Sequence, residues 1–442
     1  MPQGRIQIGI WGLGRDGEAA ARHLREARPD AELTLLSDNE TERAPESLPG
    51  MTLLTGDAAR KAISAGDFDL VVKSPGVPII RPEIAEGQAN GTTFTSGTNL
   101  WFEANQPQCT VAITGTKGKS TTSLLLHHMA EAAGARSMLL GNGGVPALAQ
   151  KPGTDLTVLE LSSYQCADLA HGPDFAVFTN LFPEHVPWHG SVEEYYAAKL
   201  RLAELDPKTK VIANTRDPRL RERLAGHPNV SWFNGDAGYA ERDGALTFDG
   251  EPVAVAGTLP RGAHNIGNLA AAASVADALG LLDDPRRVDL GQYGDLPHRL
   301  QVFELAGGVT AVDDSISTIP EATLAALSLF PDRRIHAILG GSDRGQHYQA
   351  LAEAIGKRGN LVAYLLPHTG ERIGETLRKA ASDIPAHPCT DLADSIQRIA
   401  KDARSGDVIL LSPAAPSHSQ FANFEERGRL FQQLCKDLIG RD

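Results

Sequence analysis

Short apolar runs alternate with stretches of helical periodicity through the first hundred residues. The runs predict strands at residues 6–11, 32–36 and 70–73, and the first periodic stretch predicts a helix at residues 18–26. Because strands that alternate with helices assemble as βαβ units, this region predicts a parallel sheet with helices packed against it. Asn105-Gln106-Pro107-Gln108 has the composition of a domain boundary.

A second alternating series begins at Cys109. It predicts strands at residues 110–114, 156–160 and 175–179, and a helix at residues 121–133 after a glycine-rich turn. A third series follows Pro297-His298-Arg299 and predicts strands at residues 335–339, 361–366 and 408–411. The predicted fold class is therefore α/β with three domains, at residues 1–107, 108–296 and 297–442.

Composition agrees with a multidomain globular chain. At roughly 150 residues per domain, 442 residues correspond to about three domains. The 42 basic and 55 acidic residues give a net charge of −13 with His neutral. This negative net charge argues against binding to nucleic acid, because binding to the phosphate backbone needs a basic face.

Cysteine usage and hydropathy indicate the compartment. The four cysteines lie far apart and form no Cys-x-x-Cys pair, so neither a zinc knuckle nor a disulfide framework is expected. No stretch approaches the roughly 18 apolar residues of a membrane span, and the N-terminal residues lack the pattern of a signal peptide. We expect a cytoplasmic location without a membrane span.

The first candidate site is the glycine-rich turn Gly12-Leu13-Gly14-Arg15-Asp16-Gly17. It follows a predicted strand and opens a helix, and Asp38 closes the next strand. Such glycines let the backbone approach a pyrophosphate at a helix N-terminus, and the acid binds a ribose hydroxyl. Alone, the pattern indicates a dinucleotide, and hence an NAD-binding oxidoreductase as one hypothesis. The alternative is a tight turn in an ordinary doubly wound domain.

The second candidate site is the segment from Thr114 to Thr121. Gly118-Lys119-Ser120 would place an ammonium on terminal phosphates, a hydroxyl on Mg²⁺ and backbone N–H groups around the anion. The spacing is unusual, because Ile113 stands where the common form has its first glycine, and Gly115 comes only three residues before Gly118. The strand before the segment and the helix after it still favour a phosphate-binding loop.

Two further side chains have the chemistry of divalent-metal ligands. Glu160 ends a predicted strand, which is where a carboxylate that anchors Mg²⁺ usually lies, and His185 follows another strand. On its own, each would be interpreted as an ordinary loop or strand-end residue. The presence of Lys119 and Ser120 favours the metal hypothesis, whereas His189 belongs to no motif and is expected to have no role in the site.

These residues resemble the Mur ligases, the ATP-dependent amide ligases of peptidoglycan precursor synthesis. The motifs occur in the family's order: Gly115-Thr116-Lys117-Gly118-Lys119-Ser120-Thr121, Glu160-Leu161-Ser162-Ser163, Glu184-His185, Tyr195-x-x-x-Lys199-Leu200, His264-Asn265-x-x-Asn268 and Leu296-Pro297-His298-Arg299. Within the family, Gly12-x-Gly14, Ser74-Pro75-Gly76 and the tail motif around Asn423-Phe424-Glu425 resemble the branch that adds glutamate to UDP-N-acetylmuramoyl-L-alanine.

The resemblance implies a Rossmann-like N-terminal domain that binds UDP in place of NAD. It further implies a central ATPase domain of the P-loop type that binds ATP, and a Rossmann-like C-terminal domain that presents the amino acid. The implied catalytic residues are Lys119, Glu160, His185 and Lys199. The implied ATP-binding residues are Gly115, Thr116, Lys117, Gly118, Lys119, Ser120, Thr121, Asn265, Arg299 and Asp314. The implied residues for the UDP substrate are Gly14, Arg15, Asp38, Ser74, Gly76, Asn142 and Ser162.

The family also implies the cofactors. ATP would phosphorylate a carboxylate, and the incoming amine would attack the acyl phosphate. Two Mg²⁺ sites are expected, with Ser120, Glu160, His185 and Lys199 as ligands. Lys199 matches the lysine that is carbamoylated in the family, which turns a cation into a carboxylate able to bind the metal.

The departures from the glutamate-adding pattern cluster in the last domain. Ile316 replaces the usual lysine after Asp314-Ser315, Ser342-Asp343-Arg344 replaces a second lysine site, and the segment 415–418 is unusual. This pattern resembles the variant that adds L-glutamate and leaves inversion to a separate epimerase. The amino-acid-binding residues expected are Thr318, Arg344, Ser417 and Phe424.

Three alternatives remain open on the sequence alone: the D-glutamate-adding ligase, the NAD-binding oxidoreductase, and an ATPase relative without ligase activity. The oxidoreductase hypothesis explains only the first hundred residues. The inactive relative is disfavoured because Lys119, Ser120, Glu160, His185 and Lys199 are all present. We expect a monomer.

Overall fold

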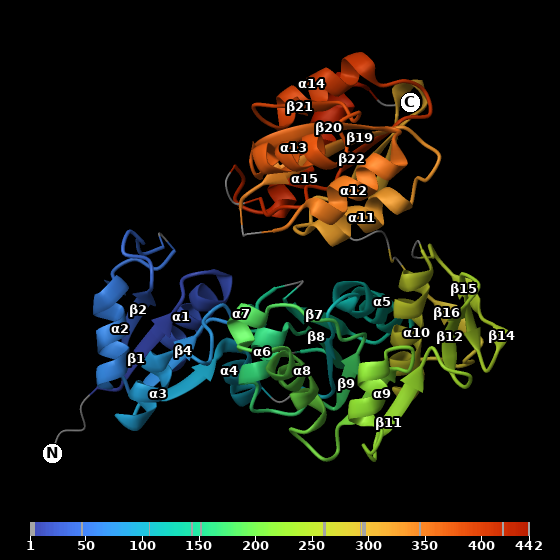
Figure 1. Ribbon diagram of the computed structural model, residues 1–442. Helices are drawn as coiled ribbons and strands as arrows, with labels where there is room; N and C mark the ends of the chain where they lie inside the picture. The colour runs from blue at the N-terminus through green and yellow to red at the C-terminus, as the bar shows by residue number, and fades with distance from the viewer. Residues whose placement is uncertain are drawn as a thin grey trace. The chain divides into compact units, whose positions relative to one another are not determined.

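A computed structural model describes residues 5–45, 47–105, 107–142, 145–150, 153–259, 262–291, 293, 298–343, 346–417 and 420–440. The chain divides into two compact units, residues 1–293 and residues 294–442. Each unit is built on parallel sheets covered by helices (Figure 1), so the prediction of an α/β fold is confirmed. The predicted domain boundaries at residues 107 and 296 remain predictions.

The first sheet of the larger unit has the strand order β3-β2-β1-β4-β5, with all neighbours parallel. Its strands are β1 (Gln7–Trp11), β2 (Glu32–Ser37), β3 (Thr52–Thr55), β4 (Leu70–Lys73) and β5 (Thr93–Ser96). Its helices are α1 (Arg15–Ala27), α2 (Gly56–Ala65), α3 (Pro82–Ala89) and α4 (Gly97–Ala104). The strands at 6–11, 32–36 and 70–73 and the helix at 18–26 are confirmed, although the helix begins three residues earlier.

Alternation along these strands explains the layers. Ile8 and Ile10 face α1 and α4, whereas Trp11 lies among residues of α2 and α3 on the other face. The strand order reverses between β1 and β4, so a crevice forms where these two strands end. The glycine-rich turn follows β1, and Ser74 follows β4, so the fold brings these two segments together at that crevice.

The second sheet has the order β11-β10-β9-β6-β8-β7, again with parallel neighbours. Its strands are β6 (Thr110–Thr114), β7 (Ser137–Gly141), β8 (Leu156–Glu160), β9 (Phe175–Phe178), β10 (Lys210–Asn214) and β11 (Val230–Phe233). Its helices are α5 (Lys119–Ala132), α6 (Ser163–Asp168), α7 (Val186–His189), α8 (Val192–Leu200), α9 (Pro218–Leu224) and α10 (Ala263–Ala278). The strands predicted at 110–114, 156–160 and 175–179 and the helix at 121–133 are confirmed within two residues.

Two helices cover one face of this sheet closely. Leu125, Leu126 and Met129 of α5 pack with the buried alanines 270–273 of α10, against alternate residues of the strands. The other face packs against α6, α8 and α9. Two small sheets accompany this domain: β12 (Tyr239–Arg242), β13 (Ala245–Phe248) and β14 (Glu251–Pro252), and the pair β15 (Ala254–Ala256) and β16 (Arg287–Asp289).

The smaller unit contains a six-stranded sheet in the order β17-β18-β22-β19-β20-β21. Its strands are β17 (Gln301–Leu305), β18 (Val309–Asp313), β19 (Ile335–Gly341), β20 (Leu361–His368), β21 (Ala386–Pro388) and β22 (Val408–Leu411). Its helices are α11 (Pro320–Ser328), α12 (Gln349–Arg358), α13 (Thr369–Ala380), α14 (Leu392–Asp402) and α15 (Phe424–Leu438). The three predicted strands are confirmed, and β17 adds an antiparallel edge that the pattern did not indicate.

Helices cover both faces of this last sheet: α11, α12 and α13 pack on one face, and α14 and α15 on the other. None of the helices in the described ranges combines the length and the apolar character needed to cross a bilayer.

Candidate active site

A glycine-bounded loop joins β6 to α5 at the centre of the second sheet. Gly115 has φ +143° and Gly118 has φ +88°, both in the region that favours glycine. A Cβ on Gly115 would lie 1.9 Å from Thr179 Oγ1, and one on Gly118 would lie 2.3 Å from Asn268 Oδ1. Sterics therefore demand both glycines, and the first N–H groups of α5 face the loop, as in a phosphate-binding turn.

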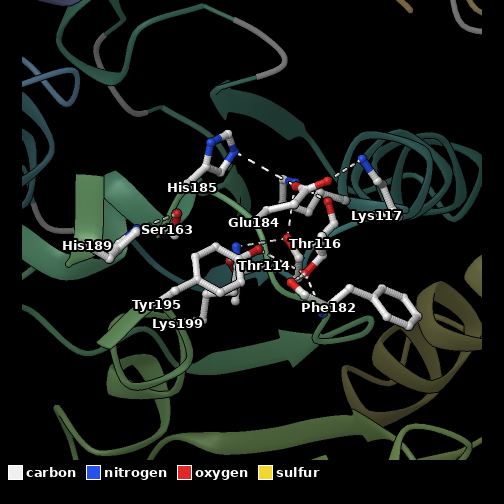
Figure 2. Close-up of polar contacts among 12 residues, drawn as sticks. Thr114, Thr116, Lys117, Ser163, Phe182, Glu184, His185, His189, Tyr195 and Lys199 are labelled. Carbon is white, nitrogen blue, oxygen red and sulfur yellow. Dashed lines mark hydrogen bonds and ion pairs between the residues drawn. The ribbon is translucent and has the colours of Figure 1, made fainter. Parts of the chain in front are cut away.

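The loop is held by contacts with segments far away in the sequence (Figure 2). Thr116 Oγ1 lies 2.9 Å from the hydroxyl of Tyr195, donates to the Phe182 carbonyl and accepts from the Phe182 amide. Lys119 Nζ donates to the carbonyl oxygens of Gly115 and Thr116, at 3.1 Å each. The Lys119 side chain thus lies over the loop; its contact with a nucleotide phosphate stays a prediction.

Glu160 and His185 reach the same edge of the sheet. Glu160 is the last residue of β8, pairs in register with Ile113 of β6, and is 1% exposed. Asn142 Nδ2 donates to Glu160 Oε1 at 3.2 Å. His185 caps α7 with φ +54°, and burial lowers the pKa of its imidazole. A lowered pKa favours the neutral imidazole, which is the form that binds metals.

The donor chemistry at this edge fits a hard divalent cation only in part. No three His, Cys, Asp or Glu side chains of the described ranges converge into a metal cluster. Of the four predicted ligands, Glu160 and His185 supply a carboxylate and an imidazole, and Ser120 lies half-buried in the first turn of α5. The fourth, Lys199, is a cation unless it is modified, so the set fits Mg²⁺ only if Lys199 gains a carboxylate.

Lys199 has the surroundings of a reactive amine. Its side chain is 2% exposed on α8, and Nζ donates to the Gly115 carbonyl at 2.9 Å and to Thr114 Oγ1 at 3.3 Å. Among the described residues no carboxylate lies within ion-pair distance of it. Burial, and then the charge of Lys119, lowers the pKa of Lys199 to about 7. A substantial share of this amine is therefore neutral at physiological pH.

A pocket of about 120 Å³ lies between the first and second sheets of the larger unit. Its lining consists of Arg15, Asp16, Pro75, Gly141, Asn142, Pro146, Ser162, Tyr164 and Gln165. The structure thus brings together three residues predicted for the UDP substrate, Arg15, Asn142 and Ser162. Tyr164 and Gln165 were not predicted, although they directly follow the predicted Ser162-Ser163 motif.

The other residues predicted for the UDP substrate lie on the first sheet. Ser74 Oγ donates to the Gly12 carbonyl at 3.0 Å, which joins the turn after β1 to the loop after β4. Asp38 pairs with Arg81 rather than lining the pocket. Gly14 caps α1 at φ −74°, where a Cβ would meet nothing within 4 Å, so sterics do not demand this glycine.

Trp188 connects this substrate side to the His185 segment. Its indole Nε1 donates to the Gly76 carbonyl at 3.2 Å, and its ring stacks on Tyr164 with centroids 4.4 Å apart. Lys73 lies over the same ring and forms a buried ion pair with Asp168 at 2.5 Å. The sequence analysis missed this connection, because partners 112 residues apart leave no local pattern.

His189 is buried against the start of α6. It is 4% exposed and lies 2.9 Å from Ser163 Oγ through Nε2. Burial lowers the pKa of His189 to about 4, which keeps the ring neutral.

The other residues predicted to bind the nucleotide are divided between the two units. Asn265 starts α10 in the larger unit and accepts a hydrogen bond from Asn268, the residue beside Gly118. Arg299 and Asp314 belong to the smaller unit. Asp314 accepts hydrogen bonds from Ser317 and Ser412, and burial raises its pKa to about 6.

Three of the residues predicted to bind the amino-acid substrate lie on segments that the buried side chain of Arg427 joins. Its guanidinium is fully buried and donates to Ser315 Oγ, the Ser315 carbonyl and the Ala415 carbonyl. Arg427 thereby joins α15, which starts at Phe424, to two loops. The loop after β18 contains Thr318, and the loop after β22 contains Ser417. Burial lowers its pKa to about 10. Arg344 lies outside the described residues.

Comparison with known proteins identifies the family. A model described as "Mur ligase middle domain" matches residues 113–276, and one described as "Mur ligase, glutamate ligase domain" matches residues 298–415. Among solved structures, UDP-N-acetylmuramate-alanine ligase MurC from Thermotoga maritima has a TM-score of 0.61 at 18% identity, covering 97% of this chain and 99% of that one. MurF ligase from the same organism, in complex with ADP, has a TM-score of 0.58 at 18% identity, covering 99% and 96%.

Curated relatives match along the whole chain. The "UDP-N-acetylmuramoyl-L-alanine--L-glutamate ligase" of Salinispora tropica is 38% identical, with 98% of each chain covered. The protein of the same name from Xanthomonas oryzae pv. oryzae is 39% identical, covering 97% of this chain and 94% of that one. The chain therefore belongs to the Mur ligase family, whose members are ATP-dependent ligases that form amide bonds, and the predicted family is confirmed.

Proposed function

We propose that this ligase joins L-glutamate to UDP-N-acetylmuramoyl-L-alanine in peptidoglycan precursor synthesis. The observation that carries the proposal is the similarity over nearly the whole chain to relatives that bear this name. The glycine-bounded loop with Lys119, and the pocket that contains Arg15 and Ser162, support it, because one suits a nucleotide phosphate and the other a second anionic substrate. ATP and UDP-sugars are cytoplasmic metabolites, so the proposed location is the cytoplasm.

The proposed chemistry follows from the weakness of a carboxylate as an acylating agent. ATP transfers its γ-phosphoryl group to the alanyl carboxylate, and the α-amine of glutamate then attacks the acyl carbon, so that the C–N bond forms and phosphate leaves. Lys119 and the N–H groups at the start of α5 stabilise the charge on the transferring phosphoryl group. Gly115, Thr116, Lys117, Gly118, Ser120 and Thr121 complete this ATP-binding segment, with Asn265, Arg299 and Asp314 on the nucleoside.

We propose Ser120, Glu160, His185 and a carbamoylated Lys199 as Mg²⁺ ligands, in two sites. Bound Mg²⁺ would supply positive charge to the phosphates. The lone pair of a neutral Lys199 amine attacks CO₂, and a proton leaves the nitrogen, so that a cation becomes a carboxylate. The pKa of about 7 supports this modification, since only the neutral amine reacts.

The sugar-nucleotide end is assigned to Gly14, Arg15, Asp38, Ser74, Gly76, Asn142 and Ser162. Arg15 at the start of α1 suits a pyrophosphate, since it adds a cation to the positive end of the helix. Ser162 also caps α6 and bonds with Gln165, which fixes its position at the pocket wall.

The amino-acid end is assigned to Thr318, Arg344, Ser417 and Phe424. Arg344, with a planar fork able to hold a carboxylate at two points, takes the place of lysines used elsewhere in the family. The further partner proposed is a separate epimerase that acts on the product, and the proposed state is a monomer.

The test of this function is phosphate release from the purified enzyme. Release is expected only when ATP, Mg²⁺, UDP-N-acetylmuramoyl-L-alanine and glutamate are present together. Each component is omitted in turn, and the product is identified by mass. Rapid release without the uridine substrate would contradict the proposal.

A further inference from the structure

An ion pair connects the glycine-bounded loop to the segment before α7. Lys117 Nζ lies 2.6 Å from Glu184 Oε1 (Figure 2), and the two side chains are 51% and 27% exposed. Lys117 lies between β6 and α5, whereas Glu184 lies between β9 and α7, directly before His185. The pair therefore joins the proposed phosphate segment to the segment that presents His185.

The backbone of Lys117 is fixed, but its side chain is not. The Lys117 amide donates to Asn180 Oδ1 at 2.8 Å. Its carbonyl accepts from Thr179 Oγ1 at 2.6 Å and from Asn180 Nδ2 at 2.9 Å. The ammonium is thus at the end of a flexible four-carbon stem on a fixed base, half in solvent, and can change its partner without moving the loop.

Two other lysines, Lys119 at the start of α5 and Lys199 on α8, already donate to carbonyl oxygens of the loop. Lys119 contacts Gly115 and Thr116, and Lys199 contacts Gly115. Lys117 instead points to a carboxylate at the edge of the loop. A polyphosphate carries several negative charges where Glu184 carries one, so Coulomb's law favours the polyphosphate as the partner of Lys117 once both are within reach.

We propose that Glu184 holds the place of a nucleotide phosphate on Lys117, and that Lys117 exchanges Glu184 for the phosphates when the nucleotide binds. This inference rests on the proposed nucleotide binding by residues 115–121. Glu184 then competes with the nucleotide for Lys117. When Lys117 leaves Glu184, the Glu184 carboxylate has no ion pair with Lys117, and its Oε2 atom lies 3.9 Å from His185 Nε2. Lys117 is a phosphate-binding residue whose availability Glu184 controls.

The exchange predicts that one substitution near the loop strengthens ADP binding instead of weakening it. Glu184→Gln keeps the shape of the side chain but removes the competing charge, so the Kd of ADP should fall by about two- to fivefold, the size of an exposed ion pair. Lys117→Met should raise the Kd of ADP. In the Lys117→Met background, Glu184→Gln should change nothing, because the competition needs the lysine.

The measurement is isothermal titration of the full chain with ADP and Mg²⁺, without acceptor substrate. Glu193→Gln is the control, since Glu193 also forms a short ion pair, with Arg223 at 2.5 Å, but lies on α8 with its side chain 75% exposed. This control should leave the Kd unchanged. Weaker ADP binding by Glu184→Gln, or an equal effect with and without Lys117, would overturn the exchange.

Lys119→Ala separates this inference from the function on which it rests. If Lys119→Ala leaves the Kd of ADP unchanged, the loop is not the nucleotide site and the proposed function of these residues fails. If Lys119→Ala weakens binding while Glu184→Gln does not tighten it, only the exchange fails.

Discussion

Two buried or half-buried lysines at one loop have different chemistry because of what surrounds them. Lys119 lies over the loop carbonyls at the start of a helix, where an ammonium is in place for phosphates. Lys199 is enclosed, next to another cation, and its pKa falls to about 7. The surroundings of Lys199 therefore suit a reactive neutral amine.

Lys119→Ala should reduce kcat by roughly 10²-fold or more, because it removes a cation that neutralises the transferring phosphoryl group. Initial rates at saturating ATP measure this. Lys119→Arg keeps the charge and is the control. Turnover of the alanine variant near that of the parent would show that other groups supply the charge.

Lys199→Ala should lose most activity, and short carboxylates should restore part of it, because the proposed role of Lys199 is to carry a negative carbamate. The parent enzyme, stripped of CO₂, should regain activity when CO₂ returns. With dissolved CO₂ held constant, the activity of the parent enzyme should recover further at pH 8 than at pH 6. The reason is that a pKa of about 7 leaves the Lys199 amine mostly protonated, and so unreactive, below pH 7. An alanine variant with normal turnover would contradict the role.

At the scale of elements, the short helix α7 connects the His185 segment to the loop after β4. His185 is its N-cap and Trp188 its third residue, and the Trp188 indole donates to the Gly76 carbonyl in the loop after β4. Tyr164, at the start of α6, stacks on the same indole and lines the pocket. The position of the Ser74–Gly76 loop is therefore coupled to the His185 segment through one side chain.

Trp188→Phe should raise KM for the UDP substrate about fivefold, since a net hydrogen bond is worth about 1 kcal/mol, while the aromatic ring keeps its stacking. KM for ATP should change little, which separates a local effect from general misfolding. Trp232→Phe, on edge strand β11, is the matched control. Equal KM values in the parent and Trp188→Phe would show that the bond to Gly76 is dispensable.

At the scale of the whole molecule, each proposed substrate has its own part of the chain. The sugar nucleotide is assigned to the first two sheets, the phosphates to the second, and the amino acid to the smaller unit. The departures from the usual glutamate pattern, at Ile316 and Arg344, are both in the smaller unit, to which the proposed function assigns the amino acid.

We predict that L-glutamate is preferred over D-glutamate by at least about tenfold in kcat/KM, or ~1.4 kcal/mol. Inverting the α-carbon while the amine still points at the acyl phosphate moves at least one carboxylate, so the cation that binds it must lie elsewhere. The loss of a lysine at Ile316 and the presence of Arg344 agree with such a move. Initial rates with enantiopure substrates decide it, and a clear preference for D-glutamate would leave the ligase assignment intact.

Local patterns in the sequence determined the central strands, the helices after the two glycine-rich turns and the residue types of the site. Continuous short apolar runs specify buried strands such as β6 and β8, and a glycine with positive φ before Lys119 specifies the loop, because both depend on neighbours in the chain. The family and the α/β class followed from these patterns in their order.

The tertiary structure alone decided which side chains meet. The order of the parallel strands places the ends of β6, β8 and β9 side by side, and this brings Lys117 to Glu184 and Thr116 to Tyr195. A contact between the segments that follow the first and second sheets brings Trp188 to Gly76. It also buries Lys199 and so lowers its pKa. These properties depend on desolvation and on contacts across 60 or more residues, for which a linear pattern carries no record.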